Sequence, residues 1–296
     1  MAVEYLLDTE IALLWVGFFV GSCMGSFLNV LAYRVPRDLS VVLPRSSCPS
    51  CKKPIPWFLN LPVLGWIILR GKARCCGSRI SFRYPVVELL VGCLFGWQFY
   101  AFSVHGDLGV LIASCLFGWI MLAVVIIDFE TMLIPDRFSI GGAFAGLFLS
   151  VYFPNLQGLV YAQGITHNVS AALSSLTGIL IGSGFLYWIG AVAGRAFGRE
   201  ALGEGDVKLL GCVGAFCGWK GAVFCIFGGA VLGCILLIPI LVCQKYKIFT
   251  SKDENQIGLG VEIPFGPYLA LAALAYFFGL KRWIDPWFAW TGELVI

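Results

Sequence analysis

The chain has 296 residues, of which 59% are hydrophobic and only 12% are charged. A soluble domain carries about 25% charged residues, so these charges are too few to cover a soluble surface. The apolar content also excludes a disordered chain, and a net charge of +3 gives no electrostatic basis for binding nucleic acid. With a mean hydropathy of +0.88, the composition predicts a polytopic α-helical protein embedded in a lipid bilayer.

Apolar segments of about 20 residues, long enough to cross the hydrocarbon of a bilayer, recur along the chain. The first, 11–33, follows acidic rather than basic residues, so we interpret it as a retained span and not as a signal peptide. Further spans are predicted at 84–104, 108–127, 138–153, 168–193, 221–243 and 263–280. The apolar run 209–219 is shorter and is interpreted as a brief or re-entrant crossing. The expected fold is therefore an all-α polytopic membrane protein with about eight transmembrane helices.

The positions of lysine and arginine indicate the orientation of these spans, because basic residues concentrate in cytoplasmic loops. The segment 34–83 holds ten of the 20 basic residues, and alternation of eight spans puts 128–137, 194–208 and 244–262 on the same side. This orientation places 17 basic residues in the cytoplasm and the N-terminus outside. The 34–83 segment is also the only predicted loop long enough for a small soluble subdomain.

Two groups of carboxylates lie at the cytoplasmic ends of predicted spans, where an ionisable side chain is costly and is a candidate functional residue. Asp128 is the first charge after a long apolar run. Asp206 follows Gly203 and Gly205, which permit a tight loop close to a ligand, and it opens a short apolar segment. Spacing alone also allows a solvated interfacial Asp128 and a helix-capping Asp206.

Helix packing could bring these two aspartates face to face, which would make an aspartic-protease site. Two carboxylates that share a site cannot both ionise easily, so they share a proton. One then activates water, while the other protonates or orients the scissile carbonyl. A Ser–His or Cys–His site at the cytoplasmic face is excluded, because His105 and His167 fall in predicted extracytoplasmic loops. Aspartic-protease chemistry itself needs no metal and no cofactor.

Asp136, the last residue of the first carboxylate group, has a simpler interpretation. The preceding Pro135 favours a helix start, so Asp136 is expected in the first turn of the next helix. A carboxylate at that position complements the helix dipole, which predicts a capping role.

Five segments of the chain, in the right order, resemble motifs of the type IV leader peptidase, or prepilin peptidase, family. They are 25–37 (GSFLNVLAYRVPR), 48–90 (which includes CPSCKKPIPWFLNLPVLGWIILRGK and ISFRYPVVELL), 128–136 (DFETMLIPD), 203–208 (GEGDVK) and 263–272 (IPFGPYLALA). The resemblance therefore covers almost the whole chain.

This resemblance implies a bacterial inner-membrane endopeptidase with Asp128 and Asp206 as its catalytic dyad. Such enzymes cleave the basic leader of type IV prepilins, and of the pseudopilins of type II secretion, at the cytoplasmic face after a glycine. Many also methylate the new N-terminus with S-adenosylmethionine, and here this second activity is expected from the resemblance alone. The residues expected to support the loops and the substrate around the dyad are Gly203, Gly205, Lys208 and Glu130.

The expected organisation has three parts, which are a first transmembrane segment (1–33), a cytoplasmic cysteine-containing loop subdomain (34–83) and a polytopic peptidase domain (84–296). The loop subdomain is the candidate for a zinc site and for a methyltransferase role. Acidic residues of the cytoplasmic loops would attract a basic leader, although each could also simply solvate the loop surface. These acidic residues are Glu130, Glu200, Glu204 and Glu262.

Four cysteines of the 34–83 loop, Cys48, Cys51, Cys75 and Cys76, are candidate metal ligands, because a reducing cytoplasm favours metal binding over disulfides. Family members with a cysteine loop carry two C-x-x-C pairs, a structural zinc arrangement. Here Ala73 stands where the second pair would begin, and Cys75 directly precedes the matching Cys76. A zinc site of irregular spacing is expected, with a reduced metal-free loop and a disulfide as alternatives.

A proton-coupled secondary transporter is the main alternative function, because the same carboxylates could relay protons. A relay favours acids near the bilayer midplane and discontinuous helices in two repeated halves. The acids here lie at one boundary and no halves repeat, which argues against a transporter. A methyltransferase-like or assembly protein with an inactive protease site is a second alternative, and the intact aspartates argue against it.

Overall fold

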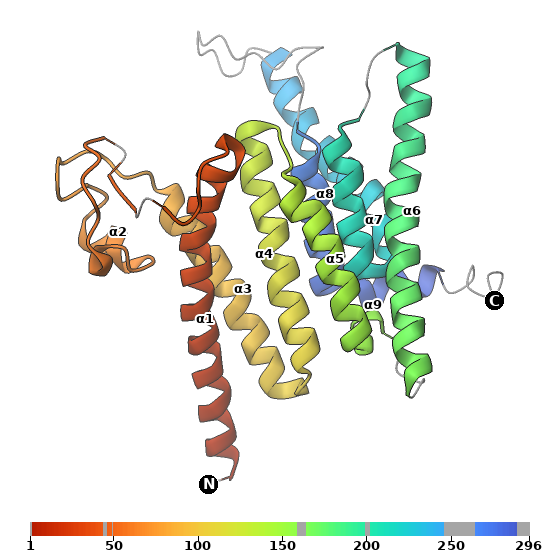
Figure 1. Cartoon of the computed structure of the whole chain (residues 1–296), viewed down its shortest axis with the longest axis horizontal. Helices are drawn as coiled ribbons and strands as arrows, with labels where there is room; N and C mark the ends of the chain where they lie inside the picture. The colour runs from red at the N-terminus through yellow and green to blue at the C-terminus, as the bar shows by residue number, and fades with distance from the viewer. Residues whose placement is uncertain are drawn as a thin grey trace. The chain divides into compact units, whose positions relative to one another are not determined.

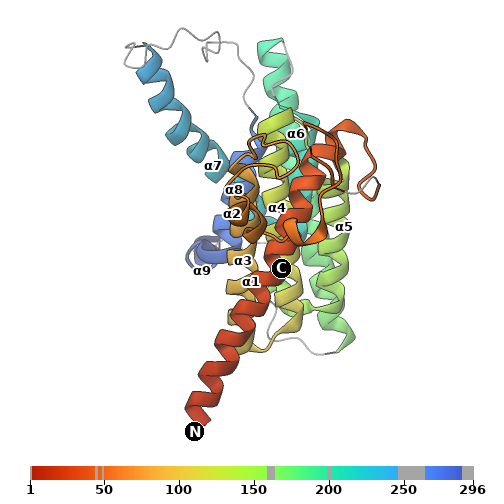
Figure 2. The same ribbon diagram turned by 90° about the vertical axis from the view of Figure 1, so that its left-hand side faces the viewer.

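The computed structural model describes residues 2–43, 46–48, 50–158, 164–198, 202–245 and 264–288 (Figures 1 and 2). Within these residues the regular structure is helical, and the β-structure consists of two isolated antiparallel bridges, Ser47 with Pro54 and Lys72 with Arg79. The predicted all-α class is therefore confirmed.

Helices lie at each range that the sequence predicts to span a membrane. The long helices are α1 (Ala2–Arg34), α3 (Arg83–His105), α4 (Leu108–Thr131), α5 (Asp136–Tyr152), α6 (Ile165–Phe197), α7 (Glu204–Lys245) and α8 (Gly266–Ala275). The short elements are η1 (Val35–Arg37), η2 (Trp57–Leu59), α2 (Leu64–Ile68), η3 (Pro154–Gln157), the π-helical η4 (Tyr276–Leu280), α9 (Lys281–Ile284) and η5 (Asp285–Phe288). Among the described residues, α1, α3, α4, α6 and α7 are long and apolar enough to cross a membrane, as judged by length and composition. The predicted span 263–280 begins just outside the described residues and continues as α8 and η4.

A sharp turn at Gly218 divides α7 into two helical halves. Gly218 has φ 67° and ψ −179°, a conformation that is open to glycine and strained for any residue with a side chain. Figures 1 and 2 show that the two halves run in opposite directions. The second half returns toward the side on which α6 ends and the first half begins. The predicted short segment 209–219 is therefore a helical piece of its own, and the predicted span 221–243 follows it.

The end of the first half of α7 is held by side chains from three other elements. The last carbonyls of a helix lack an intrahelical donor, and here the carbonyl of Ala215 accepts hydrogen bonds from outside the helix. The donors are Gln157 Nε2 of η3 at 2.9 Å, Ser175 Oγ of α6 at 3.0 Å and Ser150 Oγ of α5 at 3.4 Å. These bonds fix the helical piece whose opposite end carries Asp206.

The chain divides into two compact units, Met1–Ala123 and Val124–Ile296, with the boundary inside α4. The sequence-based division into 1–33, 34–83 and 84–296 concerns functional parts rather than compactness, so it stays a prediction.

Small residues allow the backbones of α1 and α3 to approach closely in the first unit. Gly17, Gly21 and Gly25 repeat every four residues along α1, and a Cβ at any of them would meet α3. At Gly25, for example, an added Cβ would stand 2.8 Å from the Cα of Glu88. Such small-residue seams are typical of helix pairs in membranes, where close backbone packing drives association.

The second unit uses the same kind of packing around the first half of α7. The backbones of α6 and α7 meet at Gly178 and Gly214, where neither position has room for a Cβ. On the α5 side, a Cβ at Gly146 would stand 2.8 Å from the Cβ of Ala215. The short helix that begins with Glu204 is therefore enclosed by its neighbours. This packing fixes the position of the residues at its N-terminus.

Candidate active site and cysteine cluster

Asp128 lies in the last turn of α4, within the unit Val124–Ile296, and is only 4% exposed. The helix ends at Thr131, because Met132 adopts a left-handed φ of 52° and Pro135 lacks the N–H that would continue the helix. The Met132 N–H donates to the Asp128 carbonyl at 2.9 Å and closes this end. The segment 128–136 thus places a buried carboxylate at a helix terminus.

Asp206 lies in the first turn of α7 and is 8% exposed. The glycine-containing run before it forms a tight loop, in which the Asp206 N–H donates to the Gly203 carbonyl at 3.2 Å. The Asp206 carboxylate turns back toward this loop, because a Cβ at Gly203 would stand 3.6 Å from Asp206 Oδ2. Leu209 and Leu210 follow and are fully buried, which anchors this end of the helix.

The structure brings Asp128 and Asp206 together within one unit, although they come from different helices. Their carboxyl groups are close enough to repel each other electrostatically. A buried pair of this kind favours a state in which the two groups hold one proton between them. The juxtaposition that the sequence reasoning required is therefore present.

A third segment reaches this pair, and the sequence reasoning assigned it no role. The N–H of Gly266, the first residue of α8, is directed at the Asp128 carboxylate. The side chain of Ile134 lies between two glycines, because a Cβ at Gly205 would stand 3.1 Å from Ile134 Cβ and a Cβ at Gly266 2.7 Å from Ile134 Cδ1. The family-like motif 263–272 includes this segment, but the sequence does not indicate that it lies beside Asp128.

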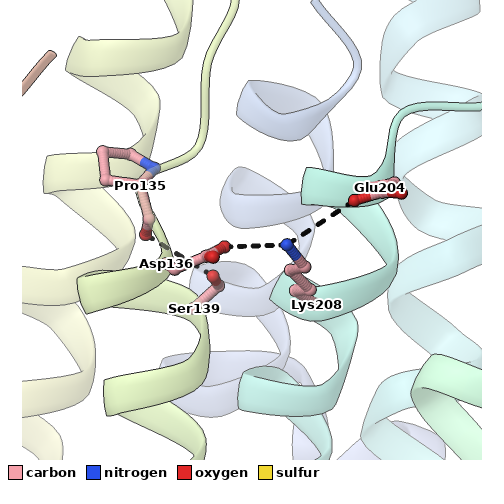
Figure 3. A network of polar contacts seen from close by, with 5 residues as sticks. All are labelled: Pro135, Asp136, Ser139, Glu204 and Lys208. Carbon is pink, nitrogen blue, oxygen red and sulfur yellow. Dashed lines mark hydrogen bonds and ion pairs between the residues drawn. The ribbon is translucent and has the colours of Figure 1, made fainter.

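Lys208 joins the N-terminal ends of α5 and α7 (Figure 3). Its Nζ lies 3.0 Å from Asp136 Oδ1 and 3.7 Å from Glu204 Oε2. Asp136 is in the first turn of α5, as predicted. Its carboxylate also accepts the Lys208 hydrogen bond, which the capping interpretation did not include.

The other predicted support residues are more exposed than the aspartates. Glu130 is exposed on the last turn of α4, and Gly203 is exposed in the loop before α7. Gly205 is half-buried against Ile134. Glu200 and Glu262 lie outside the described residues.

The four candidate metal ligands, Cys48, Cys51, Cys75 and Cys76, gather in the first unit. Their sulfurs all lie within 4.8 Å of one another. The Cys48–Cys76 and Cys51–Cys75 sulfur distances are 3.6 and 3.1 Å, and adjacent Cys75 and Cys76 are 3.9 Å apart. Four sulfurs about 2.3 Å from one zinc ion stand roughly 3.8 Å apart in a tetrahedron, so the donor set fits zinc despite its irregular spacing.

Two short turns present these cysteines. In the first, Lys52 donates to the Cys48 carbonyl at 2.9 Å, and in the second, Gly77 donates to the Ala73 carbonyl at 2.7 Å. Backbone N–H groups of Cys51 and then Ser50 lower the pKa of Cys48 to about 6, which favours the thiolate form that binds metals. The first turn is therefore preorganised for a ligand.

Glu88 is a buried carboxylate in the first unit. It belongs to the motif 48–90, but the sequence alone predicted no role for it. It is 7% exposed on α3 and accepts the Val63 N–H at 2.7 Å and a hydrogen bond from Ser26 of α1. Val63 has φ 60°, which is strained for a β-branched residue. An ionisable residue inside a predicted span was the available signal.

Comparison with known proteins identifies the family. A sequence model described as "Bacterial Peptidase A24 N-terminal domain" matches residues 19–102, and one described as "Type IV leader peptidase family" matches residues 115–238. The chain belongs to the type IV leader peptidase family. The family predicted from the five motifs is therefore confirmed.

Three relatives align with most of this chain, and each is named "Prepilin leader peptidase/N-methyltransferase". The protein from Stutzerimonas stutzeri is 30% identical over 91% of this chain and 92% of its own length. The one from Dichelobacter nodosus is 31% identical over 95% of this chain and 96% of its own. The Myxococcus xanthus relative is 35% identical over 75% of this chain, which spans 62% of that protein. No solved structure shows a significant match, and none of these names favours the transporter alternative.

Proposed function

We propose that this protein is an intramembrane aspartic endopeptidase that removes the leader peptide of type IV prepilins and pseudopilins, with Asp128 and Asp206 as its catalytic pair. The observation that carries the proposal is the pair of buried, mutually repelling carboxyl groups at the ends of α4 and α7. The names of the relatives support the substrate class. Incubation of the purified protein with a prepilin in detergent, followed by intact-mass measurement, should show loss of the leader, and an unchanged mass would contradict the proposal.

The chemistry follows from one proton held by two carboxyl groups. The ionised carboxylate takes a proton from water, while the protonated partner donates to the scissile carbonyl oxygen as the water oxygen attacks the carbon. The resulting tetrahedral species collapses when the leaving amine receives a proton from the pair. Asp128 and Asp206 titrate as a unit, so the roles of base and acid belong to the pair.

The surrounding segments position the pair for this reaction. The tight loop at Gly203 fixes Asp206, and the Lys208–Asp136 contact ties the start of α7 to the start of α5. Ordered loops of this kind hold reacting groups in a productive geometry, which accounts for a large part of enzymatic rate enhancement. Gly203, Gly205 and Lys208 therefore act as supports and not as reacting groups.

The charge distribution supports a cytoplasmic site in the inner membrane, with the N-terminus outside. Basic residues concentrate in the predicted cytoplasmic loops, and the carboxylates of Glu130, Asp136 and Glu204 are exposed near the catalytic pair. A prepilin leader is basic and precedes an apolar helix, so its scissile bond would lie near the membrane boundary. Exposed acidic residues there would raise the local concentration of such a leader.

We also propose that the protein methylates the new N-terminus with S-adenosylmethionine, through the 34–83 segment and the helices beside it. The relatives' names include this activity. The first unit supplies hydrogen-bond acceptors that suit a cationic donor, because Glu88 is a buried carboxylate and Asn29 Oδ1 is a buried oxygen without a hydrogen-bond partner. Asn29 Nδ2 donates to the Tyr84 carbonyl, one helical turn before Glu88. S-adenosylmethionine would supply the methyl group that is bonded to its positively charged sulfonium sulfur.

We propose that Cys48, Cys51, Cys75 and Cys76 are the ligands of a structural zinc ion. The sulfur distances and the thiolate-favouring surroundings of Cys48 support this assignment. Four protein ligands leave no open position for substrate, so the ion would link the two cysteine turns and not take part in cleavage.

A further inference from the structure

The start of α8 is directed at the catalytic pair. Gly266 is the first residue of α8, and its N–H is directed at the Asp128 carboxylate. The first N–H groups of a helix have no intrahelical partner and form the positive end of the helix dipole. The partial positive charge at this helix end therefore faces the Asp128 carboxylate.

The same position has no room for a side chain. A Cβ at Gly266 would stand 2.5 Å from Asp128 Oδ2, 3.3 Å from Asp128 Cγ and 2.7 Å from Ile134 Cδ1. Contacts under 3.0 Å force some group to move, and here the Asp128 carboxylate and the end of the Ile134 side chain both stand in the way. By contrast, a Cβ at Gly184 of α6 would meet no atom within 4 Å.

The helix that carries Gly266 is itself held firmly, so its N–H is a fixed donor. Leu269 is fully buried and packs on the second half of α7, where a Cβ at Gly229 would stand 3.2 Å from the Leu269 Cα. Ala272 faces Gly228 in the same way, at 3.3 Å. Close backbone packing at these glycines leaves α8 little freedom to withdraw from Asp128.

We propose that Gly266 is a positioning residue for the peptidase reaction, because its N–H and its missing side chain together fix the Asp128 carboxylate opposite Asp206. This inference rests on the proposed catalytic role of Asp128. It gives the α8 segment a function, as the third wall of the site beside the ends of α4 and α7.

The first test is Gly266→Ala, with Gly184→Ala as a matched control. The added methyl group should displace the Asp128 carboxylate and lower kcat by about 10- to 100-fold, the effect expected of a misplacement near 1 Å. The KM for prepilin should change little, because leader binding does not involve this contact. Gly184→Ala should keep the wild-type kcat. A folded Gly266→Ala protein with wild-type kcat would overturn the proposal.

A second variant separates the two clashes. Ile134→Ala in the Gly266→Ala background removes the contact with Ile134 Cδ1 and leaves the contact with Asp128 Oδ2. The double variant should therefore regain thermal stability but not kcat. Full recovery of kcat would show that Gly266 serves packing against Ile134 and would overturn the positioning role.

A spectroscopic test covers the case in which Gly266→Ala does not fold. Labelling with ¹³C-carbonyl phenylalanine and ¹⁵N-glycine selects the six Phe–Gly pairs of the sequence, including Phe265–Gly266. In Asp128→Ala one of these amide protons should move upfield as it loses its charged acceptor. If none moves, the hydrogen bond is absent and the inference fails. Retained cleavage by Asp128→Asn would instead refute the proposed function itself, so the two failures are distinguishable.

Discussion

Lys208 Nζ lies 3.0 Å from Asp136 Oδ1, although 72 positions separate the two residues in the chain. The contact joins the first turn of α7, which carries Asp206, to the first turn of α5, which follows the loop after Asp128. It therefore links the two segments that supply the proposed catalytic pair.

Breaking this contact should cost little stability, because both partners are partly exposed. Lys208→Met and Asp136→Asn should each lower the midpoint of thermal unfolding slightly, and their effects should be less than additive in a double-mutant cycle. Glu204 is 92% exposed and 3.7 Å from Lys208, so Glu204→Gln should change stability less and serves as the control. Strictly additive effects of the Lys208 and Asp136 substitutions would show that the contact contributes nothing.

The cysteine cluster should carry about one zinc ion per chain, as a four-thiolate site does. Elemental analysis of the purified, reduced protein measures this content, and Cys48→Ser combined with Cys51→Ser should abolish it. Cys234 is exposed on α7 and far from the cluster in sequence, so Cys234→Ser should leave the zinc content unchanged. Leader cleavage should survive chelators, because the proposed ion does not take part in it. Metal-free wild-type protein would contradict the site.

Glu88→Gln should separate the two proposed activities. Glutamine is nearly isosteric and can still accept the Val63 N–H, but it carries no charge. Methylation, read as the mass of one methyl group on the cleaved product, should fall by at least about tenfold, the effect of losing one charge-assisted hydrogen bond. Cleavage should continue. Gln98→Met removes another buried polar side chain of α3 and is the control. Equal loss of both activities would indicate a purely structural Glu88.

Accessibility labelling of single introduced cysteines should place the segments around Asp128 and Asp206 on the same side of the membrane. Cysteines at Glu130 and Glu204 should react from the cytoplasmic side, and cysteines at Asp107 and His167 should react from outside, as the distribution of basic residues predicts. Labelling of positions 130 and 204 from opposite faces would make the catalytic pair impossible.

The helices of this fold could be predicted because long apolar runs have few other stable arrangements in a bilayer. Even the short segment 209–219 was separable from 221–243, and the structure shows that Gly218 makes the division. The helix that starts at Asp136 follows from Pro135, whose geometry suits a helix start. These features depend on local sequence alone.

The contacts that complete the site depend on distant segments and could not be predicted. Lys208 and Glu204 are four residues apart on one helix, a spacing that suggests a pair, but no local pattern links Lys208 to Asp136. The N–H of Gly266 reaches Asp128 from the far end of the chain. The irregular Cys75–Cys76 spacing favoured a zinc site but left a metal-free loop and a disulfide as alternatives, and only the folded turns show that both sulfurs lie beside those of Cys48 and Cys51.

The central claim is that Asp128 and Asp206 carry the reaction, and isosteric substitution tests it most directly. Asparagine nearly matches aspartate in size but cannot take up the proton, so Asp128→Asn and Asp206→Asn should each lower the cleavage rate by about 10²–10⁴-fold or more. The double variant should be no worse than either single variant, because the two residues act as a unit. Asp136→Asn and Glu130→Gln, as controls, should keep most of the activity.

The decisive measurement is the single-turnover rate of leader removal from a prepilin by each folded variant, followed by intact mass. The account predicts an intact precursor with both asparagine variants and a processed product with both controls. Substantial cleavage by either Asp128→Asn or Asp206→Asn, in a variant that unfolds at the wild-type temperature, would contradict it.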